Sequence, residues 1–259
     1  MYRCILLSAA FACLSLTVSA QKYKVKSIQH ERITIDSRLD SKVDSKAVSF
    51  MKPYKKKVDE IMAPVVGHCA RNMRSETPES EMSNLLPDIL VWSALRDYNE
   101  KVDFAIYNIG GIRSTFSKGE VTQGDVVDVA PFENKICFIT LKGCDVLELF
   151  QQIARRHGEG VSEAVRAVIT KDGKLVSVTI NGKSVDPQAS YRIATIDYLI
   201  EGNDGMLALR KGTNVVSPSE EKNNTRFIIM DYFREAEKRG EVVDAEVEGR
   251  MVETPSVTP

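Results

Sequence analysis

The stretch Asn108-Ile109-Gly110-Gly111-Ile112-Arg113 carries the side chains in this sequence that best suit ligand binding. It follows an apolar run at residues 104–107, which predicts a buried strand. Two adjacent glycines at a strand end allow the backbone to adopt positive φ and to approach a ligand closely. The Asn108 amide and the Arg113 guanidinium can then converge on an anionic or oxygen-rich group. The alternative is a tight turn with a surface arginine, and the loops downstream decide between the two.

Two further loops add aromatic and acidic side chains. Pro131 and Phe132 precede a strongly apolar run, and the loop at residues 197–205 follows another and contains Tyr198 and Asp204. Two aromatic rings can stack on a base, and a carboxylate can accept hydrogen bonds from ribose hydroxyls. Arginine and asparagine can hold a phosphate or the edge of a sugar. Together the three loops favour a nucleoside site at one edge of a sheet.

The spacing of apolar residues predicts the elements that position these loops. Strands are expected at residues 21–35, 103–107, 136–141, 164–170, 175–180, 191–196 and 242–247. Helices are expected from Ala47 to about Ile61, at 83–99, from Gly143 to Gly158 and at 225–238, with a short helix or a loop at 121–129. We find no internal repeat. This order of elements predicts an α+β domain in which helices flank a mixed β-sheet.

The first 20 residues have the pattern of an export signal. Arg3 precedes an apolar stretch at residues 5–12, and Val18-Ser19-Ala20 resembles a signal-peptidase site. A lipidation signal ending at Cys13 is the alternative, because a small residue precedes that cysteine. Either signal predicts an exported protein, periplasmic or extracellular, with a lipid anchor through Cys13 in the second case.

The remaining chain divides into three expected parts. Residues 21–72 form an N-terminal extension of strand and helix, residues 73–250 form the domain, and residues 251–259 form a flexible tail. Within the extension, residues 36–46 are charged and serine-rich and predict a loop. The apolar positions of the helix that follows recur every three or four residues, at Ala47, Met51, Tyr54, Val58 and Ile61. Pro53 should kink this helix or begin its second part.

Charge and cysteine content exclude other classes of protein. The formal net charge of −1 argues against nucleic acid or an anionic membrane as the main partner. Cleavage after Ala20 leaves Cys69, Cys137 and Cys144, and an odd number is a poor disulfide framework. Cys137 lies in an apolar run and is expected in the core. A bridge between Cys137 and Cys144 remains open.

Several motifs, taken together, are typical of one enzyme family. They are Met82-Ser83-Asn84-Leu85 with Asp88, Asn108 to Arg113, Val129-Ala130-Pro131-Phe132, Gly143, Tyr191-Arg192-Ile193-Ala194-Thr195 and Gly202-Asn203-Asp204-Gly205. From about Met73 to Leu209 the chain therefore resembles the C-terminal domain of the 5′-nucleotidase family, whose members hydrolyse nucleotides and UDP-sugars. In that family this domain binds the nucleotide and a separate N-terminal domain performs the chemistry.

The resemblance implies a role for each matching residue. Asn108 and Arg113 would contact ribose or phosphate, Phe132 and Tyr198 would stack on the base, and Asp204 would bind ribose hydroxyls. The family usually has phenylalanine where this chain has Tyr198. It also has an arginine before the helix at 83–99, for which Arg74 or Arg71 is the candidate. The full expected substrate-binding set is Asn108, Gly110, Gly111, Arg113, Phe132, Tyr198, Asn203, Asp204 and Arg74.

The ligands for a catalytic metal centre are missing from the sequence. The family's chemistry needs two divalent metal ions held by clustered Asp, His and Asn residues. The three histidines, His30, His68 and His157, stand alone without D-x-H, G-D-x-x-D, G-N-H-E or G-H-x-H around them. We therefore expect this chain to bind no cofactor and to be inactive by itself, with the metals on a partner phosphoesterase.

Three hypotheses follow. The chain is half of a split 5′-nucleotidase, a stand-alone binder of nucleosides or nucleotides, or a structural remnant. The intact set of pocket residues argues against the remnant. An exposed apolar patch in residues 21–70 would support the split enzyme, and a covered surface would support the binder.

Overall fold

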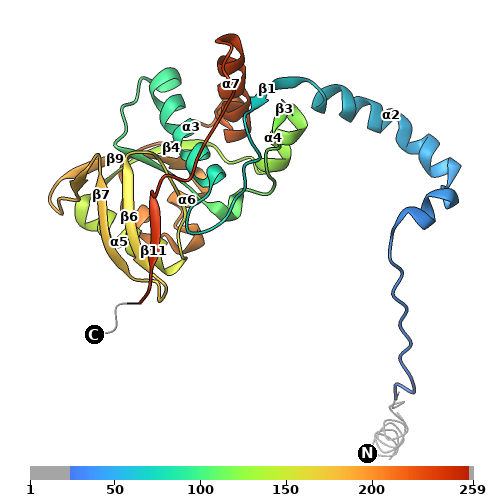
Figure 1. Ribbon diagram of the computed structural model, residues 1–259, viewed down its shortest axis with the longest axis horizontal. Coiled ribbons are helices and arrows are strands. Elements are labelled where there is room, and N and C mark those ends of the chain that lie inside the picture. The colour runs from blue at the N-terminus through green and yellow to red at the C-terminus, as the bar shows by residue number, and fades with distance from the viewer. Residues whose placement is uncertain (1–23, 257–259) are drawn as a thin grey trace, which may run out of the picture. The chain divides into compact units, whose positions relative to one another are not determined.

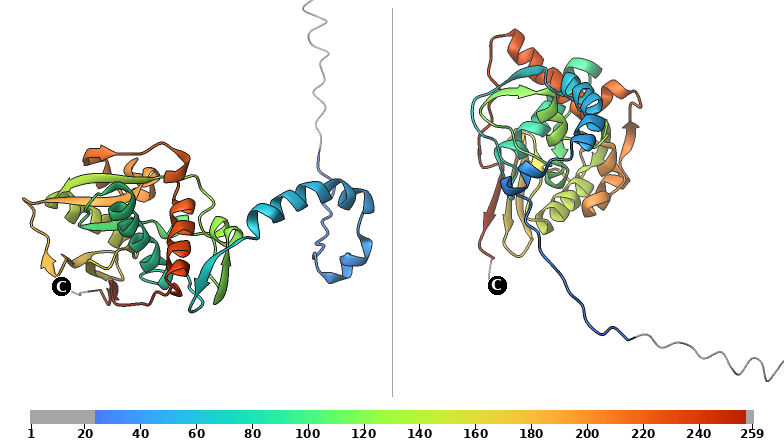
Figure 2. Two further views of the ribbon diagram at one scale, coloured as in Figure 1. Left: turned by 90° about the horizontal axis from the view of Figure 1, so that it is seen from above. Right: turned by 90° about the vertical axis from the view of Figure 1, so that its right-hand side faces the viewer.

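A computed structural model describes residues 24–256 (Figures 1 and 2). The predicted export signal, Cys13, Tyr23 of the first predicted strand and residues 257–259 lie outside the described residues. By its internal contacts the chain divides into one unit that ends at Met51 and another that begins at Lys52. Within residues 24–256, no helix combines the length and the apolar character needed to cross a membrane.

The N-terminal segment differs from the prediction. Residues 24–35 form no strand, and their apolar side chains, such as Ile28 and Ile35, are exposed. Alternating apolar residues become a strand only when a neighbouring strand pairs with them, and no strand among residues 24–256 pairs with this segment. The predicted loop contains a short 3-10 helix, Ser37–Lys42. Helix α2, Ser45–Met62, continues through Pro53 and buries none of its residues.

The central sheet has five strands in the order β10-β4-β9-β2-β5. They are β2 (Phe104–Tyr107), β4 (Ile136–Lys142), β5 (Gly160–Val161), β9 (Ser190–Ile196) and β10 (Thr213–Val216). β2 is parallel to β9, whereas β4 is antiparallel to β9 and β5 is antiparallel to β2. The ends of β2 and β9 and the starts of β4 and β5 therefore meet at one edge of the sheet.

The predicted helices are present, with some ends shifted. Besides α2 they are α3 (Glu81–Tyr98), α4 (Gln123–Val129), α5 (Gly143–Arg155) and α7 (Thr225–Lys238). A short helix that was not predicted, α6 (Asp197–Ile200), forms within the predicted loop at residues 197–205. α3 begins two residues earlier than predicted because Ser80 and Ser83 form a reciprocal capping box. Pro87 consequently lies in the helix interior, and the apolar side chain of Leu95 near the end of the helix is exposed.

α3 and α5 cover opposite faces of the central sheet. Phe104 in β2 packs on Phe150 of α5, with ring centroids 5.8 Å apart. Phe138 in β4 packs on Tyr98 of α3 at 5.1 Å. Phe104 and Phe138 pair with two adjacent residues of β9. Adjacent residues of a strand point to opposite faces of the sheet, so the two phenylalanine side chains do as well. Burial on both faces explains why β2 is apolar at every position.

A second sheet has the order β11-β6-β7-β8 (Figure 1). Its strands are β6 (Val165–Thr170), β7 (Leu175–Ile180), β8 (Lys183–Ser184) and β11 (Met251–Thr254). α5 contacts both this sheet and the central one. Residues 251–254, which were predicted in a flexible tail, thus form β11, parallel to β6. The strand predicted at 242–247 is reduced to a single bridge between Val243 and Cys69, because no neighbouring strand pairs with the rest of it.

A third, two-stranded sheet joins β1 (Val65–Cys69) to β3 (Gly119–Thr122). α7 contacts β1 and also α3, beside which it lies in Figure 2. Residues 65–69, predicted as part of the extension, are therefore paired with a strand from residues 73–250.

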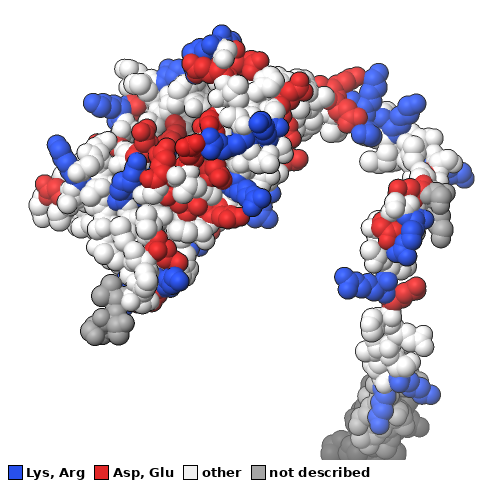
Figure 3. All heavy atoms as spheres, in the orientation of Figure 1, with Lys and Arg blue, Asp and Glu red and all other residues white. Residues whose placement is uncertain are grey.

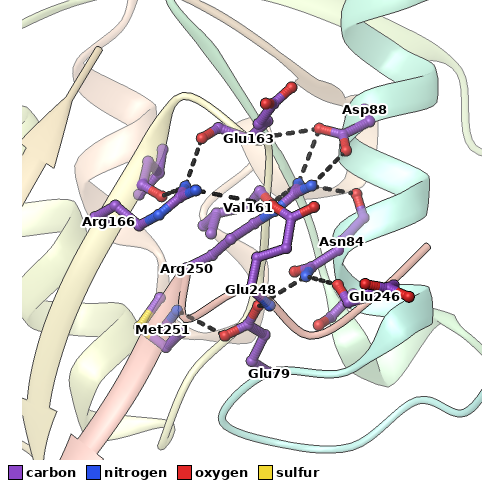
Figure 4. A network of polar contacts seen from close by, with 12 residues as sticks. Glu79, Asn84, Asp88, Val161, Glu163, Arg166, Glu246, Glu248, Arg250 and Met251 are labelled. Atoms are coloured by element: carbon purple, nitrogen blue, oxygen red, sulfur yellow. Dashed lines mark hydrogen bonds and ion pairs between the residues drawn. The ribbon is translucent and has the colours of Figure 1, made fainter. Parts of the chain in front are cut away.

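Arg250 fastens the C-terminal segment to α3 (Figure 4). Its side chain is 4% exposed and donates to both carboxylate oxygens of Asp88, at 2.9 and 2.8 Å. Glu79 accepts the main-chain N–H groups of Glu248 and Met251 at 2.8 and 3.2 Å. These contacts place Met251 at the start of β11, a long-range effect with no local sequence signal.

The three described cysteines are free. Cys137 is buried in β4, as predicted, Cys69 is also buried and Cys144 is exposed. The bridge between Cys137 and Cys144 that the sequence left open is absent from this structure.

Candidate functional site

A pocket of about 300 Å³ lies beside the loops that follow β2 and β9. It is lined by Asn108, Gly110, Gly111, Arg113, Phe132, Asn134, Tyr198 and Asp204. All but Asn134 belong to the set expected from the sequence. β2 pairs with β9 in parallel, and β4 pairs with β9 in antiparallel orientation. The loops after β2 and β9 and the loop before β4 therefore meet, as the sequence predicted.

The two remaining predicted residues do not line this pocket. The Asn203 side-chain amide donates to the Tyr198 carbonyl at 2.8 Å and so supports the loop that carries the ring. Arg74 is exposed and lines a different hollow, together with Thr115 and Ser117. Arg71, the other arginine considered, is engaged in ion pairs with two carboxylates of the C-terminal segment.

Gly110 and Gly111 act differently from the prediction. They end a 3-10 turn, Ile109–Gly111, and neither has positive φ. A Cβ on Gly111 would lie 2.7 Å from Asn108 Oδ1, whereas a Cβ on Gly110 would meet no atom within 4 Å. Close packing inside the turn, and not left-handed backbone, therefore requires the glycine at 111. The left-handed residue of the pocket is Asp204, at φ 53° and ψ 23°.

Asp204 is the hub of the polar contacts in the pocket. Its Oδ2 accepts a hydrogen bond from Asn108 Nδ2 at 2.7 Å, and its Oδ1 accepts one from the Tyr198 hydroxyl at 3.3 Å. Arg156 lies 3.8 Å from Oδ1. A hydrogen bond to each of its two oxygens therefore fixes the orientation of the Asp204 carboxylate. Burial, together with Asp204, raises the pKa of the Tyr198 hydroxyl.

A buried glutamate that the sequence reasoning missed supports the Asn108 loop. Glu159 is 2% exposed and accepts the Ile109 N–H at 2.6 Å and the Arg156 Nε–H at 2.5 Å. Burial raises the pKa of the Glu159 carboxyl, even though both hydrogen bonds oppose this shift. The available sequence signal was a lone acidic residue between two glycines, Gly158 and Gly160, directly before β5.

The loop that carries Phe132 is tied to its neighbours. Arg226 of α7 donates to the Pro131 carbonyl at 2.8 Å, and the Asp197 N–H donates to the Lys135 carbonyl at 2.9 Å. Phe132 is 47% exposed and Tyr198 is 37% exposed, so both rings are accessible on a supported backbone. Such a pocket can hold a flat ring and a polyhydroxylated group.

The histidines are not gathered at the pocket. His68 pairs with Glu237 at 2.8 Å, and His157 pairs with Glu253 at 2.9 Å. Across residues 24–256, no three His, Cys, Asp or Glu side chains converge as metal ligands would. The residues present in that range do not fit a two-metal centre.

The chain has an α+β fold with a pocket at one edge of its central sheet. A sequence model described as "5′-nucleotidase, C-terminal domain" matches residues 62–211, which is more than half of the chain. The chain belongs to this family.

This chain spans less than half the length of the relatives described below. A 5′-nucleotidase of Vibrio cholerae serotype O1 is 29% identical over 169 residues, which cover 63% of this chain and 30% of the relative. The cell wall protein Lmo0130 of Listeria monocytogenes is 28% identical over 70% of this chain and 24% of its own length. The crystal structure of a 5′-nucleotidase precursor from Thermus thermophilus superposes with a TM-score of 0.69 at 25% identity, over 83% of this chain and 44% of that one.

Proposed function

We propose that this chain is the nucleotide-recognition half of an exported 5′-nucleotidase. It binds nucleoside 5′-monophosphates, and a separate two-metal phosphoesterase chain hydrolyses the phosphate ester. The observation that carries the proposal is the single pocket in which Phe132, Tyr198, Asp204 and Asn108 converge. The family match and the Vibrio cholerae relative support the substrate class.

Each side chain has a task in this proposal. The rings of Phe132 and Tyr198 stack on the base. Asp204 accepts hydrogen bonds from ribose hydroxyls, and its bonds to Asn108 and Tyr198 hold it ready to do so. Arg113 is exposed at the pocket, where its guanidinium donates to the Gly110 carbonyl at 3.3 Å, so it can hold the phosphate where another chain can reach it.

The partner supplies the metal chemistry, because residues 24–256 offer no converging ligand set. Two metal ions would polarise the phosphate and generate the attacking hydroxide. Export is supported by the signal-like first 20 residues and by the relative described as a cell wall protein. Anchoring through Cys13 is the alternative form of export.

The test combines binding with catalysis. Residues 21–259 are titrated calorimetrically with adenosine and AMP, and phosphate release from AMP is assayed with added divalent metal. We expect binding without release, and we expect release once a two-metal phosphoesterase chain of the same genome is added. Phosphate release by this chain alone would overturn the assignment of roles.

One observation favours a second candidate, a stand-alone nucleoside-binding protein. The pocket is held by contacts between described residues of this chain, from Asn108 to Asp204 at 2.7 Å and from the Ile109 N–H to Glu159 at 2.6 Å, as a binding protein that acts alone requires. AMP binding that persists while every phosphoesterase chain fails to release phosphate would select this function.

A further inference from the structure

The Asp204 carboxylate has little acceptor capacity left for a ligand. A carboxylate offers about four lone pairs to hydrogen-bond donors. Asn108 Nδ2 uses one on Oδ2, at 2.7 Å, and the Tyr198 hydroxyl uses one on Oδ1, at 3.3 Å. The guanidinium of Arg156 lies 3.8 Å from the same Oδ1. Oδ1 is therefore occupied by groups of this chain, whereas Oδ2 keeps one lone pair for a ligand in the pocket that Asp204 lines.

The contact between Tyr198 and Asp204 is built into one loop. Tyr198 lies in α6, and Asp204 lies six residues further along in the 3-10 turn Asn203–Gly205. The Tyr198 N–H donates to the Asp197 carboxylate at 2.8 Å, which holds the start of α6. A phenolic hydroxyl lies in the plane of its ring, so Tyr198 can donate to Asp204 while a face of the ring stacks on a base.

Arg156 is not free to take the place of the Tyr198 hydroxyl. At 3.8 Å it lies beyond hydrogen-bond distance of Asp204. Its Nε donates to the buried carboxylate of Glu159 at 2.5 Å, and the other oxygen of Glu159 accepts the Ile109 N–H at 2.6 Å. Because Glu159 is held by the Asn108 loop, it holds Arg156 at this distance from Asp204. The Tyr198 hydroxyl is thus the donor that fills Oδ1.

The Asn108 side chain offers a ribose hydroxyl no second acceptor. Its Nδ2 is a donor that is already bound to Asp204. Its Oδ1 has no hydrogen-bond partner among the described residues, but this atom has almost no exposed surface and packs against Gly111, where an added Cβ would lie 2.7 Å away. A ribose carries two neighbouring hydroxyls, and the lone pair left on Asp204 Oδ2 can bind one of them.

We propose that the Tyr198 hydroxyl sets the sugar selectivity of this pocket. By filling Oδ1 it limits Asp204 to one of the two ribose hydroxyls. The pocket therefore accepts deoxyribonucleoside 5′-monophosphates that lack the other hydroxyl, as well as ribonucleotides. The inference rests on the proposed function, because it refines which sugar the same site accepts.

The experiment titrates residues 21–259 calorimetrically with AMP, 2′-deoxy-AMP and 3′-deoxy-AMP. Figure 3 shows acidic and basic side chains next to one another on one face of the molecule. The three nucleotides carry the same charge, so this surface affects them alike and the differences between their dissociation constants report the sugar contacts. We expect one deoxy analogue to bind the parent within about threefold of AMP and the other to bind roughly tenfold more weakly or worse, since it loses the hydroxyl that Asp204 holds.

Tyr198→Phe removes the hydroxyl and keeps the ring. AMP should bind this variant within about threefold of the parent, because the second ribose hydroxyl can donate to the vacated Oδ1. The analogue that the parent tolerates should bind the variant at least roughly tenfold more weakly than AMP does, because it covers Oδ1 without supplying a donor. Tyr232→Phe makes the same change in α7, where the ring packs on Trp92 at a different hollow, and is the matched control. It should leave the ratios between the three nucleotides unchanged.

Each other outcome is decisive. If Tyr198→Phe leaves the ratio of the tolerated analogue to AMP as it is in the parent, the hydroxyl does not set the selectivity, and the proposed function stands. Rejection of both analogues by the parent would show that Asp204 binds both hydroxyls, and equal binding of all three nucleotides would show that it binds neither. Both results overturn the inference. If the parent binds no AMP, the proposed function fails and the inference fails with it.

Discussion

The Asn108 side chain donates a 2.7 Å hydrogen bond to Asp204, which lies 96 residues further along the chain. The bond joins the loop after β2 to the loop after β9, and the parallel pairing of these strands makes it possible. Asp204 adopts left-handed backbone to reach this position. Non-glycine residues in that conformation concentrate at functional sites, where neighbouring contacts hold them.

Replacing the carboxylate at the centre of this contact tests its role. Asp204→Asn keeps the shape of the side chain but loses a charged acceptor, and hydrogen bonds to charged groups contribute about 1.5–3 kcal/mol. We expect adenosine and AMP to bind roughly 10- to 100-fold more weakly by calorimetry. Asp186→Asn, which changes an exposed carboxylate in the turn before β9, is the control and should bind as the parent does.

The aromatic pair is tested by truncating one ring at a time. Phe132→Ala and Tyr198→Ala should each cost about 1–3 kcal/mol of adenosine binding, because each removes one stacking surface. Tyr198→Phe keeps the ring and should retain most of the affinity, which calorimetry can measure beside the alanine variants. Equal binding by the parent and both alanine variants would show that the base lies elsewhere.

Stability at acid pH should depend on Glu79. Burial raises the pKa of this carboxyl, but hydrogen bonds from Asn84 and from three main-chain N–H groups outweigh burial and lower the pKa below its ordinary value. A carboxyl whose pKa is lower in the folded state than in the unfolded state stabilises the fold at pH values above the unfolded-state pKa. This stabilisation is lost as the pH falls through the folded-state pKa. Urea unfolding between about pH 5 and pH 3 should therefore show a steeper fall for the parent than for Glu79→Gln.

The control for this pH series is Glu133→Gln, which changes an exposed carboxyl. The free energy of unfolding of Glu133→Gln should fall with pH as steeply as that of the parent. Parallel pH profiles for Glu79→Gln and the parent would mean that the Glu79 contacts do not favour the ionised form.

The ion pair between Arg250 and Asp88 should contribute to the free energy of unfolding, because the Arg250 side chain is buried. Arg250→Met leaves Asp88 without its main partner, and breaking a buried pair in this way costs about 3–5 kcal/mol. We expect a value near the lower end in urea unfolding, because the Asp88 side chain is 33% exposed. Arg166→Met, which changes an arginine that is 44% exposed, should cost about 1 kcal/mol or less. A loss for Arg250→Met as small as that of the control would argue against the anchoring role of Arg250.

Thiol labelling should distinguish the three cysteines of residues 21–259. Burial raises the pKa of Cys69 to about 12 and that of Cys137 to about 11, so neither thiol ionises readily in the folded protein. Cys144 is exposed. One thiol per chain should react with a disulfide reagent at neutral pH, and three should react in urea. A single reactive thiol in urea without reductant would reveal a bridge.

Much of the site was readable from the sequence because its chemistry lies in short loops next to strongly apolar strands. Asn108, Phe132, Tyr198 and Asp204 each follow or precede such a strand, and a sheet edge is where loops of this kind meet. Glu159 was missed because a single acidic residue between two glycines gives no periodic signal, and Asn134 was missed because it lies among other polar residues, between Glu133 and Lys135. Arg74 was placed by resemblance alone, and the structure puts it at another hollow.

The sequence by itself determined the α+β class, the main helices and strands and the residue types of the pocket, since each depends on local apolar periodicity and turn chemistry. Only the tertiary structure decided which segments pair. Residues 24–35 have a strand-like pattern but no neighbour, and residues 251–254 form β11 because Arg250 and Glu79 hold that segment beside β6. A strand is completed by hydrogen bonds to another strand, and the identity of that partner is not encoded in the strand's own residues.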